Sequence, residues 1–116
     1  MALDPAQQQP SPPGQPAGVV FFDRRELNQL LGLYGRMVAA GNWRDYAIDH
    51  LKDAAVFSVF RHASETPLYR IEKHPDLARR QGAWRVLAHG GLVLKRGREL
   101  DHVLRLFDRA RFAVVK

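Results

Sequence analysis

The chain of 116 residues contains no cysteine. Without thiols it can form no disulfide bond, no thiolate-ligated metal site and no cysteine nucleophile, which is consistent with a reducing compartment. No apolar run approaches the ~20 residues that cross a bilayer. The N-terminal segment MALDPAQQ lacks the basic and apolar regions of a secretion signal. We therefore expect a cytoplasmic protein that does not act at a membrane.

Motifs of catalysis and cofactor binding are also missing. No serine lies in a Gly-x-Ser-x-Gly or Ser-x-x-Lys motif, and no glycine-rich loop leads into Gly-Lys-Ser/Thr. No two histidines stand three or four positions apart, as a metal pair on one helix requires; the histidines are His50, His62, His74, His89 and His102. We expect no catalytic residue, no metal and no cofactor, and therefore a protein that is not an enzyme.

A proline- and glutamine-rich segment precedes a sequence of ordinary globular composition. Residues 1–17 contain five prolines and almost no apolar side chain that could be buried. Such a segment cannot offset the entropy cost of ordering, so we predict a disordered tail over residues 1–18. The remaining length suits one domain, residues 19–116, and the apolar content of 46% can supply its core.

Positive charge is concentrated in the second half of the chain. The net charge is +6, with −1 on residues 1–60 and +7 on residues 61–116. This asymmetry favours a polyanionic partner, either nucleic acid or an acidic protein. The alternative is a solvated basic surface that only keeps the protein soluble.

Two amphipathic helices are predicted. Asp23 and Glu26 have the spacing of a capping box, and Gly41 is a typical residue just beyond a C-cap, which predicts a helix over residues 24–40. Apolar residues at helical spacing predict a second helix over residues 98–110. Residues 112–115 read as a final strand or a frayed end.

Strand patterns fill the chain between these helices. Residues 54–60 are apolar on both alternating faces, which predicts a central strand over residues 54–62 that is covered on both sides. Residues 47–51 are ambiguous between a helical turn and an edge strand, and a strand is favoured. Further strands are predicted over residues 68–73, 84–88 and 92–95. The fold class is α+β, with a four-stranded, mainly antiparallel sheet and two main helices on one face.

The candidate site is a basic surface. Alternation places Arg61, Arg70, Arg85 and Lys95 on the sheet face away from the helices, with Tyr69 and Trp84 either at its edges or in the core. Such a face is one way to hold single-stranded nucleic acid. The full set of possible polyanion-binding residues is Arg61, Arg70, Lys73, Arg79, Arg80, Arg85, Lys95, Arg96 and Arg98.

Four runs resemble a family of small alphaproteobacterial proteins catalogued as a domain of unknown function. They are residues 22–27 (FDRREL), 43–48 (WRDYAI), 53–61 (DAAVFSVFR) and 68–73 (LYRIEK). The resemblance covers about residues 21–109. It implies a bacterial, cytoplasmic setting, and it supplies no activity, cofactor or functional residue.

Two functions follow as hypotheses. The first is a non-enzymatic nucleic-acid-binding or regulatory protein that acts through its basic surface. The second is a protein–protein interaction module without a nucleic-acid role. One form of such a module is a homodimer joined through an edge strand such as residues 92–95, or through the helix face that carries Gly32 and Gly35.

Overall fold

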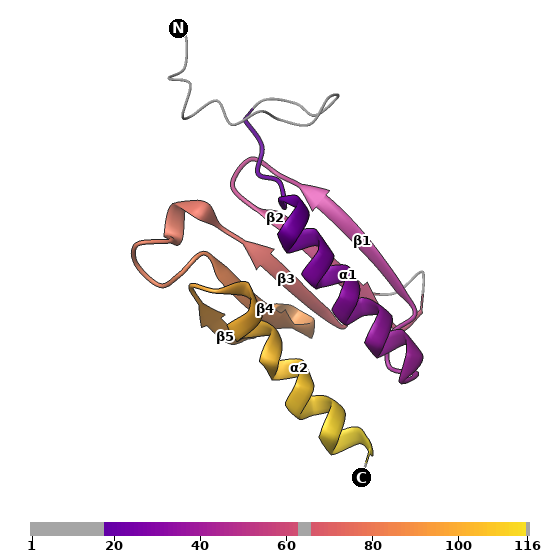
Figure 1. Ribbon diagram of the computed structural model, residues 1–116. Coiled ribbons are helices and arrows are strands. Elements are labelled where there is room, and N and C mark those ends of the chain that lie inside the picture. Colours follow the sequence, from indigo (N-terminus) through magenta and orange to yellow (C-terminus); the bar gives the residue numbers. More distant parts are fainter. Residues whose placement is uncertain (1–17, 63–65, 116) are drawn as a thin grey trace, which may run out of the picture.

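A five-stranded antiparallel sheet with two helices on one face forms the structure (Figure 1). The computed structural model describes residues 18–62 and 66–115, with side chains up to residue 108. The predicted disordered tail lies outside the described residues, apart from Gly18. Each strand pairs with its neighbours in sequence, in the order β1 (Asp45–His50), β2 (Ala55–Phe60), β3 (Tyr69–Lys73), β4 (Trp84–Ala88) and β5 (Val93–Gly97).

The sheet has one strand more than the four predicted. The additional strand is β1, which pairs with β2 along its whole length, from Asp45 opposite Phe60 to His50 opposite Ala55. The preference for a strand over residues 47–51 is therefore confirmed, and the strand count was wrong because this segment was not included in the sheet. Along β1 one face carries Asp45, Ala47 and Asp49 and the other carries Tyr46, Ile48 and His50, as in an edge strand with one covered face.

Helix α1 (Arg24–Ala39) begins where its cap was predicted. Asp23 Oδ1 accepts from the Glu26 amide, and Glu26 Oε1 accepts from the Asp23 amide, both at 2.8 Å. Leu30, Leu33 and Met37 form its buried face. No other backbone segment comes close to Gly32 or Gly35 in the described structure. A Cβ placed at either residue would meet no backbone atom outside the helix within 4 Å.

Helix α2 (Leu100–Val115) starts two residues later than predicted and runs past the predicted end. The proposed final strand at residues 112–115 is wrong, since these residues continue the helix. No glycine or proline stands between Arg98 and the end of the chain to stop it. The β-branched pair at positions 114 and 115 had suggested a strand, but neighbouring context overrides such weak preferences.

Turns between the later strands depend on glycine. The β4–β5 connection is η2 (His89–Gly91), and Gly90 and Gly91 both have positive φ, as expected for a tight turn. Between β3 and β4 the chain forms the 3-10 helix η1 (Pro75–Leu77), which is followed by turns.

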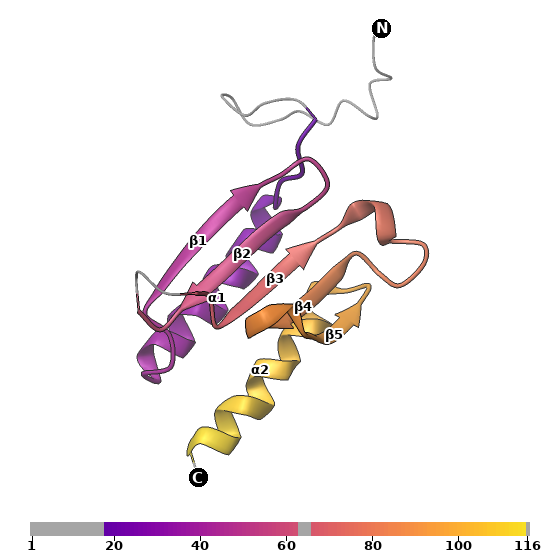
Figure 2. The same ribbon diagram turned by 180° about the vertical axis from the view of Figure 1, so that it is seen from behind.

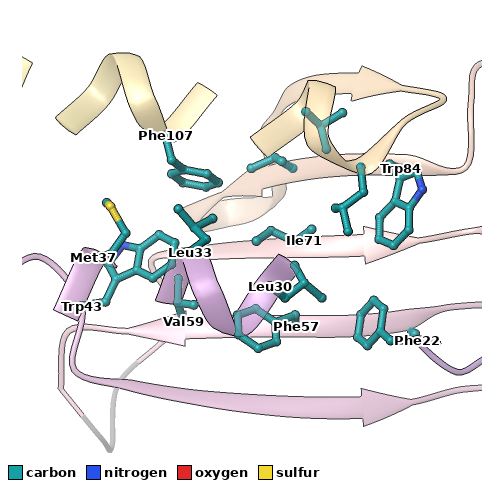
Figure 3. Close-up of a cluster of buried hydrophobic side chains, with 14 residues drawn as sticks. Phe22, Leu30, Leu33, Met37, Trp43, Phe57, Val59, Ile71, Trp84 and Phe107 are labelled. Atoms are coloured by element: carbon teal, nitrogen blue, oxygen red, sulfur yellow. The ribbon is translucent and has the colours of Figure 1, made fainter. Parts of the chain in front are cut away.

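The core lies between the helices and the sheet face that they cover (Figure 3). Phe57, Ile71 and Val86 stand side by side on β2, β3 and β4 and are fully buried. Leu33 of α1 and Phe107 of α2 pack onto this layer, and at about 25 cal/mol per Å² such burial is the main source of stability.

The opposite face of the sheet carries no helix (Figure 2). Strand β2 was predicted to be covered on both sides, and the described structure covers only one side with a second layer. Val56 and Ser58 nevertheless have exposed fractions of only 8% and 5% on the other side. On β3 the residues directly opposite them are Glu72 and Arg70, which belong to the candidate site.

Candidate functional site

The sheet face away from α1 and α2, here called the open face, receives alternate residues from all five strands. Antiparallel register places directly opposite residues on the same face. Two adjacent rows cross it: the first holds Asp49, Val56, Glu72, Arg85 and Arg96, and the second holds Ala47, Ser58, Arg70, Leu87 and Val93.

Three of the nine predicted basic residues meet on this face. Arg70, Arg85 and Arg96, here called the arginine cluster, come from β3, β4 and β5. Adjacent strands lie about 4.8 Å apart, so the cluster spans about 10 Å across the sheet. Arg85 and Arg96 are directly opposite each other, an arrangement of like charges that costs stability.

Glu72 lies at the centre of the open face and holds two members of the arginine cluster. Arg85 donates from Nε to Glu72 Oε1 at 3.0 Å, and Arg70 Nε lies 3.3 Å from Oε2. His74 Nε2 lies 2.8 Å from Oε1. The Glu72 side chain is only 8% exposed, whereas that of Arg70 is 42% exposed, so the carboxylate lies beneath the guanidinium groups.

The environment of Glu72 keeps it ionised. Burial raises the pKa of its carboxyl group, but hydrogen bonds from His74 and Arg85, with the charges of Arg85 and Arg70, lower it more. The resulting pKa lies below the ordinary value of 4.5. At neutral pH the carboxylate is therefore charged and offsets one of the three positive charges of the cluster.

Both ion pairs use the Nε atom of the arginine. The Nη groups, which form the outer part of the guanidinium fork, are left without an acidic partner among the described residues. Guanidinium forks match the oxygens of phosphate and carboxylate groups in pairs. The arrangement can therefore present oriented donors to an anion that lies over the sheet.

The other predicted basic residues lie elsewhere. Lys73 is on the helix side, where Nζ donates to Phe21 O (2.8 Å) and Glu26 Oε1 (2.7 Å), so its role is structural. Lys95 stands opposite Val86 and belongs to the helix side, which corrects its predicted place. Arg61 follows β2 and lines cavities beside Met37 and Phe107, not the open face. Arg79 and Arg80 are exposed in the turns after η1, and Arg98 precedes α2.

Of the two places considered for Tyr69 and Trp84, the structure shows the core for both. Trp84 is 5% exposed and stacks on Phe22, and Tyr69 packs against Trp43 and Phe107. Both belong to the core side of the sheet. Alternation along β2 leaves Phe60 as the single strand aromatic on the open face within the described part of the chain.

Sequence reasoning did not single out Glu72, His74 or the pairing of Arg85 with Arg96. Alternation along β3 does place Arg70 and Glu72 on one face. The cross-strand register, which brings Arg85 beside Glu72, is the missing information, and the β-bulge between Val86 and Leu87 sets the phase of β5.

Other kinds of site are not visible in the described residues. None of their histidine, aspartate and glutamate side chains gather in groups of three suited to a metal ion. Among the helices of the described ranges, none is long and apolar enough to span a membrane.

Comparison with known proteins places the chain in a family. The family model described as "Protein of unknown function (DUF2794)" matches residues 20–104. The chain belongs to the DUF2794 family. The DUF2794 match includes α1, all five strands and the start of α2, and therefore the whole arginine cluster. The expected resemblance to a domain of unknown function is confirmed. The search of curated proteins and the search of solved structures each found no match.

Proposed function

We propose that this DUF2794 protein binds single-stranded nucleic acid through the open face, without catalysis. The observation that supports the proposal most is the arginine cluster around a buried, ionised Glu72. Folding brings Arg85 and Arg96 opposite each other at a cost in stability. An anionic ligand over the sheet would relieve that repulsion.

The expected contacts are to phosphates. The guanidinium groups of Arg70 and Arg85 are held at Nε by Glu72, so less side-chain freedom is lost when their Nη groups bind a phosphate. Phosphate contacts position a nucleic acid and carry no sequence information. Binding should therefore be largely independent of sequence.

A single strand fits this surface better than a duplex does. The described open face is a sheet from which no helix projects, whereas duplex readers insert a helix or a β-ribbon into a groove. Phe60 is the one strand aromatic on the face, so stacking contributes little and the affinity should depend strongly on salt.

Fluorescence anisotropy with labelled oligo(dT), oligo(U) and a duplex of the same length tests the proposal. We expect micromolar binding of the single strands at low salt, weaker binding of the duplex, and loss of binding as salt rises. The triple variant Arg70→Gln/Arg85→Gln/Arg96→Gln should lose most of the affinity. If none of the three ligands binds at low salt, the proposal is refuted.

A second candidate is a homodimer joined through β5. This strand is an edge of the sheet; Leu92, just before it, is 64% exposed, and Leu94, within it, is 38% exposed. An unpaired edge with apolar side chains is suited to pairing with a second copy. Sedimentation velocity distinguishes the candidates: a dimer that Leu94→Lys dissociates supports this one, and a monomer at high concentration excludes it.

A further inference from the structure

Arg85 and Arg96 form a pair within the arginine cluster. They stand directly opposite each other on β4 and β5, and the row that holds them crosses β3 at Glu72. The Cβ atoms of such opposite residues lie about 5 Å apart, so two long side chains can converge on one group above the sheet. Arg70 belongs to the adjacent row and is not part of this pair. The pair therefore offers two guanidinium forks at one place.

Both oxygens of Glu72 are engaged by other side chains. Oε1 lies 3.0 Å from Arg85 Nε and 2.8 Å from His74 Nε2, and Oε2 lies 3.3 Å from Arg70 Nε. Arg96 is exposed and forms no ion pair within the described residues. One member of the pair is thus held in position by Glu72, and the other has no acid of its own in this part of the chain.

The local charge at this place is positive. Residues 66–108, which contain β3, β4 and β5, are described without a gap. Three guanidinium groups and one ionised carboxylate leave the arginine cluster together with Glu72 a net charge of +2. The other acid of the row, Asp49, is on β1, about 14 Å from Arg85 at the usual strand spacing. Salt screens charges over such a distance, so a ligand with two negative charges complements the cluster.

A terminal phosphate matches the pair better than a phosphate inside a strand does. A phosphomonoester carries a charge of about −1.5 to −2 at pH 7 and presents three acceptor oxygens. Each internal phosphate carries one negative charge. Guanidinium groups bind phosphate oxygens through paired N–H donors, and two of them can hold one monoester from two sides. A doubly charged group between Arg85 and Arg96 also offsets the repulsion within the pair.

We propose that Arg85 and Arg96 bind the terminal phosphate of a single-stranded nucleic acid, while Arg70 contacts a phosphate further along the strand. This role rests on the proposed function of the open face, and it adds a preference for strands that end in a phosphate. The preference comes from convergent hydrogen bonds and charge, so it does not depend on the identity of the last base.

Fluorescence anisotropy compares oligo(dT) strands of about six nucleotides that end in a 5′-phosphate, in a 3′-phosphate or only in hydroxyl groups, with the dye at the opposite end. We expect at least one phosphorylated strand to bind about tenfold more tightly than the hydroxyl strand at the same salt. A hydroxyl strand with one more nucleotide gains an internal charge instead, and should bind at most about twofold more tightly. Equal affinities of the phosphorylated strands and this longer strand overturn the terminal-phosphate site alone. Failure of every strand to bind overturns the proposed function as well.

Two variants separate the pair from a general effect of charge. Arg96→Gln should bring phosphorylated and hydroxyl strands within about twofold of each other, with Tm unchanged or raised because a like-charge contact is lost. Arg105→Gln removes the same charge from an exposed position on α2 and should keep the preference. The phosphorus-31 NMR signal of the terminal phosphate should shift on binding to the wild type and much less with Arg96→Gln. A full preference in Arg96→Gln, or its loss in Arg105→Gln, contradicts the assignment.

Discussion

Glu72 shows how much of the open face depends on one side chain. It is the only acid that pairs with Arg70 or Arg85 within the described residues, and it also contacts His74. Removing its charge leaves two guanidinium groups close together without a counterion. The partners remain partly exposed, so water replaces some of the lost interaction.

We predict that Glu72→Gln lowers the free energy of unfolding by about 1–2 kcal/mol at pH 7. The folded-state pKa of Glu72 lies below the ordinary value of 4.5. Its ionised form therefore stabilises the fold above about pH 4.5, and this contribution is lost as pH falls through the folded-state pKa. Urea denaturation from pH 7 to pH 3 should show the difference between wild type and variant shrinking toward acid.

The control is Asp101→Asn, which removes an exposed acid whose nearest cationic atom is 3.9 Å away. We expect it to change stability by less than about 0.5 kcal/mol across the same pH range. The difference in free energy of unfolding between the wild type and Glu72→Gln should neither stay constant with pH nor grow toward acid. Either result contradicts the assigned direction of the Glu72 pKa shift.

At this scale the sequence allowed some side-chain positions to be predicted and not others. Alternation correctly turned Arg70 and Glu72 away from the helices. It failed for Lys95, because the bulge between Val86 and Leu87 shifts β5 by one residue and turns Arg96 outward instead. Tyr69 and Trp84 share the face of Ile71 and Val86, which alternation alone placed in the core.

Among the elements, the approach of the β3–β4 connection to the end of β5 depends on one glycine. Gly82 has φ of 89°, and a Cβ there would lie 2.3 Å from Gly97 O. Both the backbone conformation and the space exclude a side chain. Gly90 has a similar φ of 84° but nothing within 4 Å of a Cβ, and so provides a matched comparison.

We predict that Gly82→Ala destabilises the protein by at least about 2 kcal/mol more than Gly90→Ala does. The Gly90 variant should cost about 1–2 kcal/mol, from the left-handed conformation alone. Midpoints of urea unfolding, with the m-value checked, measure both changes. Equal losses in the two variants would mean that the close approach of Gly97 to Gly82 is absent in solution.

Element boundaries were predictable where local chemistry marks them. Asp23 and Glu26 form the expected capping box, and Gly41 follows α1 with positive φ. The end of α2 carries no such mark, so its extension to Val115 could not be derived. Membership of β1 in the sheet depends on a hairpin with β2, and the connection between them, residues 51–54 (LKDA), contains no glycine, proline or asparagine that would mark the turn.

Over the whole molecule, the basic residues after position 60 do not share one surface. Arg70, Arg85 and Arg96 lie on the open face, and Lys73 and Lys95 are on the helix side. Arg61, Arg79, Arg80 and Arg98 lie in the connections, and Arg105 lies on α2. The excess of positive charge was readable from composition. How that charge is divided between the two faces of the sheet could not be read from composition. The division follows from strand register and from the placement of both helices on one side.

Positive charge on the helix side supplies a control of equal size. Arg24, Arg25 and Arg105 are exposed on α1 and α2, away from the open face. Changing all three to glutamine removes the same net charge as the triple variant of the arginine cluster. A general electrostatic effect would weaken nucleic-acid binding equally in both variants. A site on the open face would make the arginine-cluster variant bind much more weakly than the helix-side variant.

The slope of log K against log salt for oligo(dT), measured for the wild type and these two triple variants, tests the open face most directly. Each phosphate contact on a single strand contributes about 0.7 to the slope, so losing the arginine cluster should reduce its magnitude by about 2. The helix-side variant should keep a slope close to that of the wild type. Equal reductions in the two variants, or no reduction in the arginine-cluster variant, would contradict a nucleic-acid site on the open face.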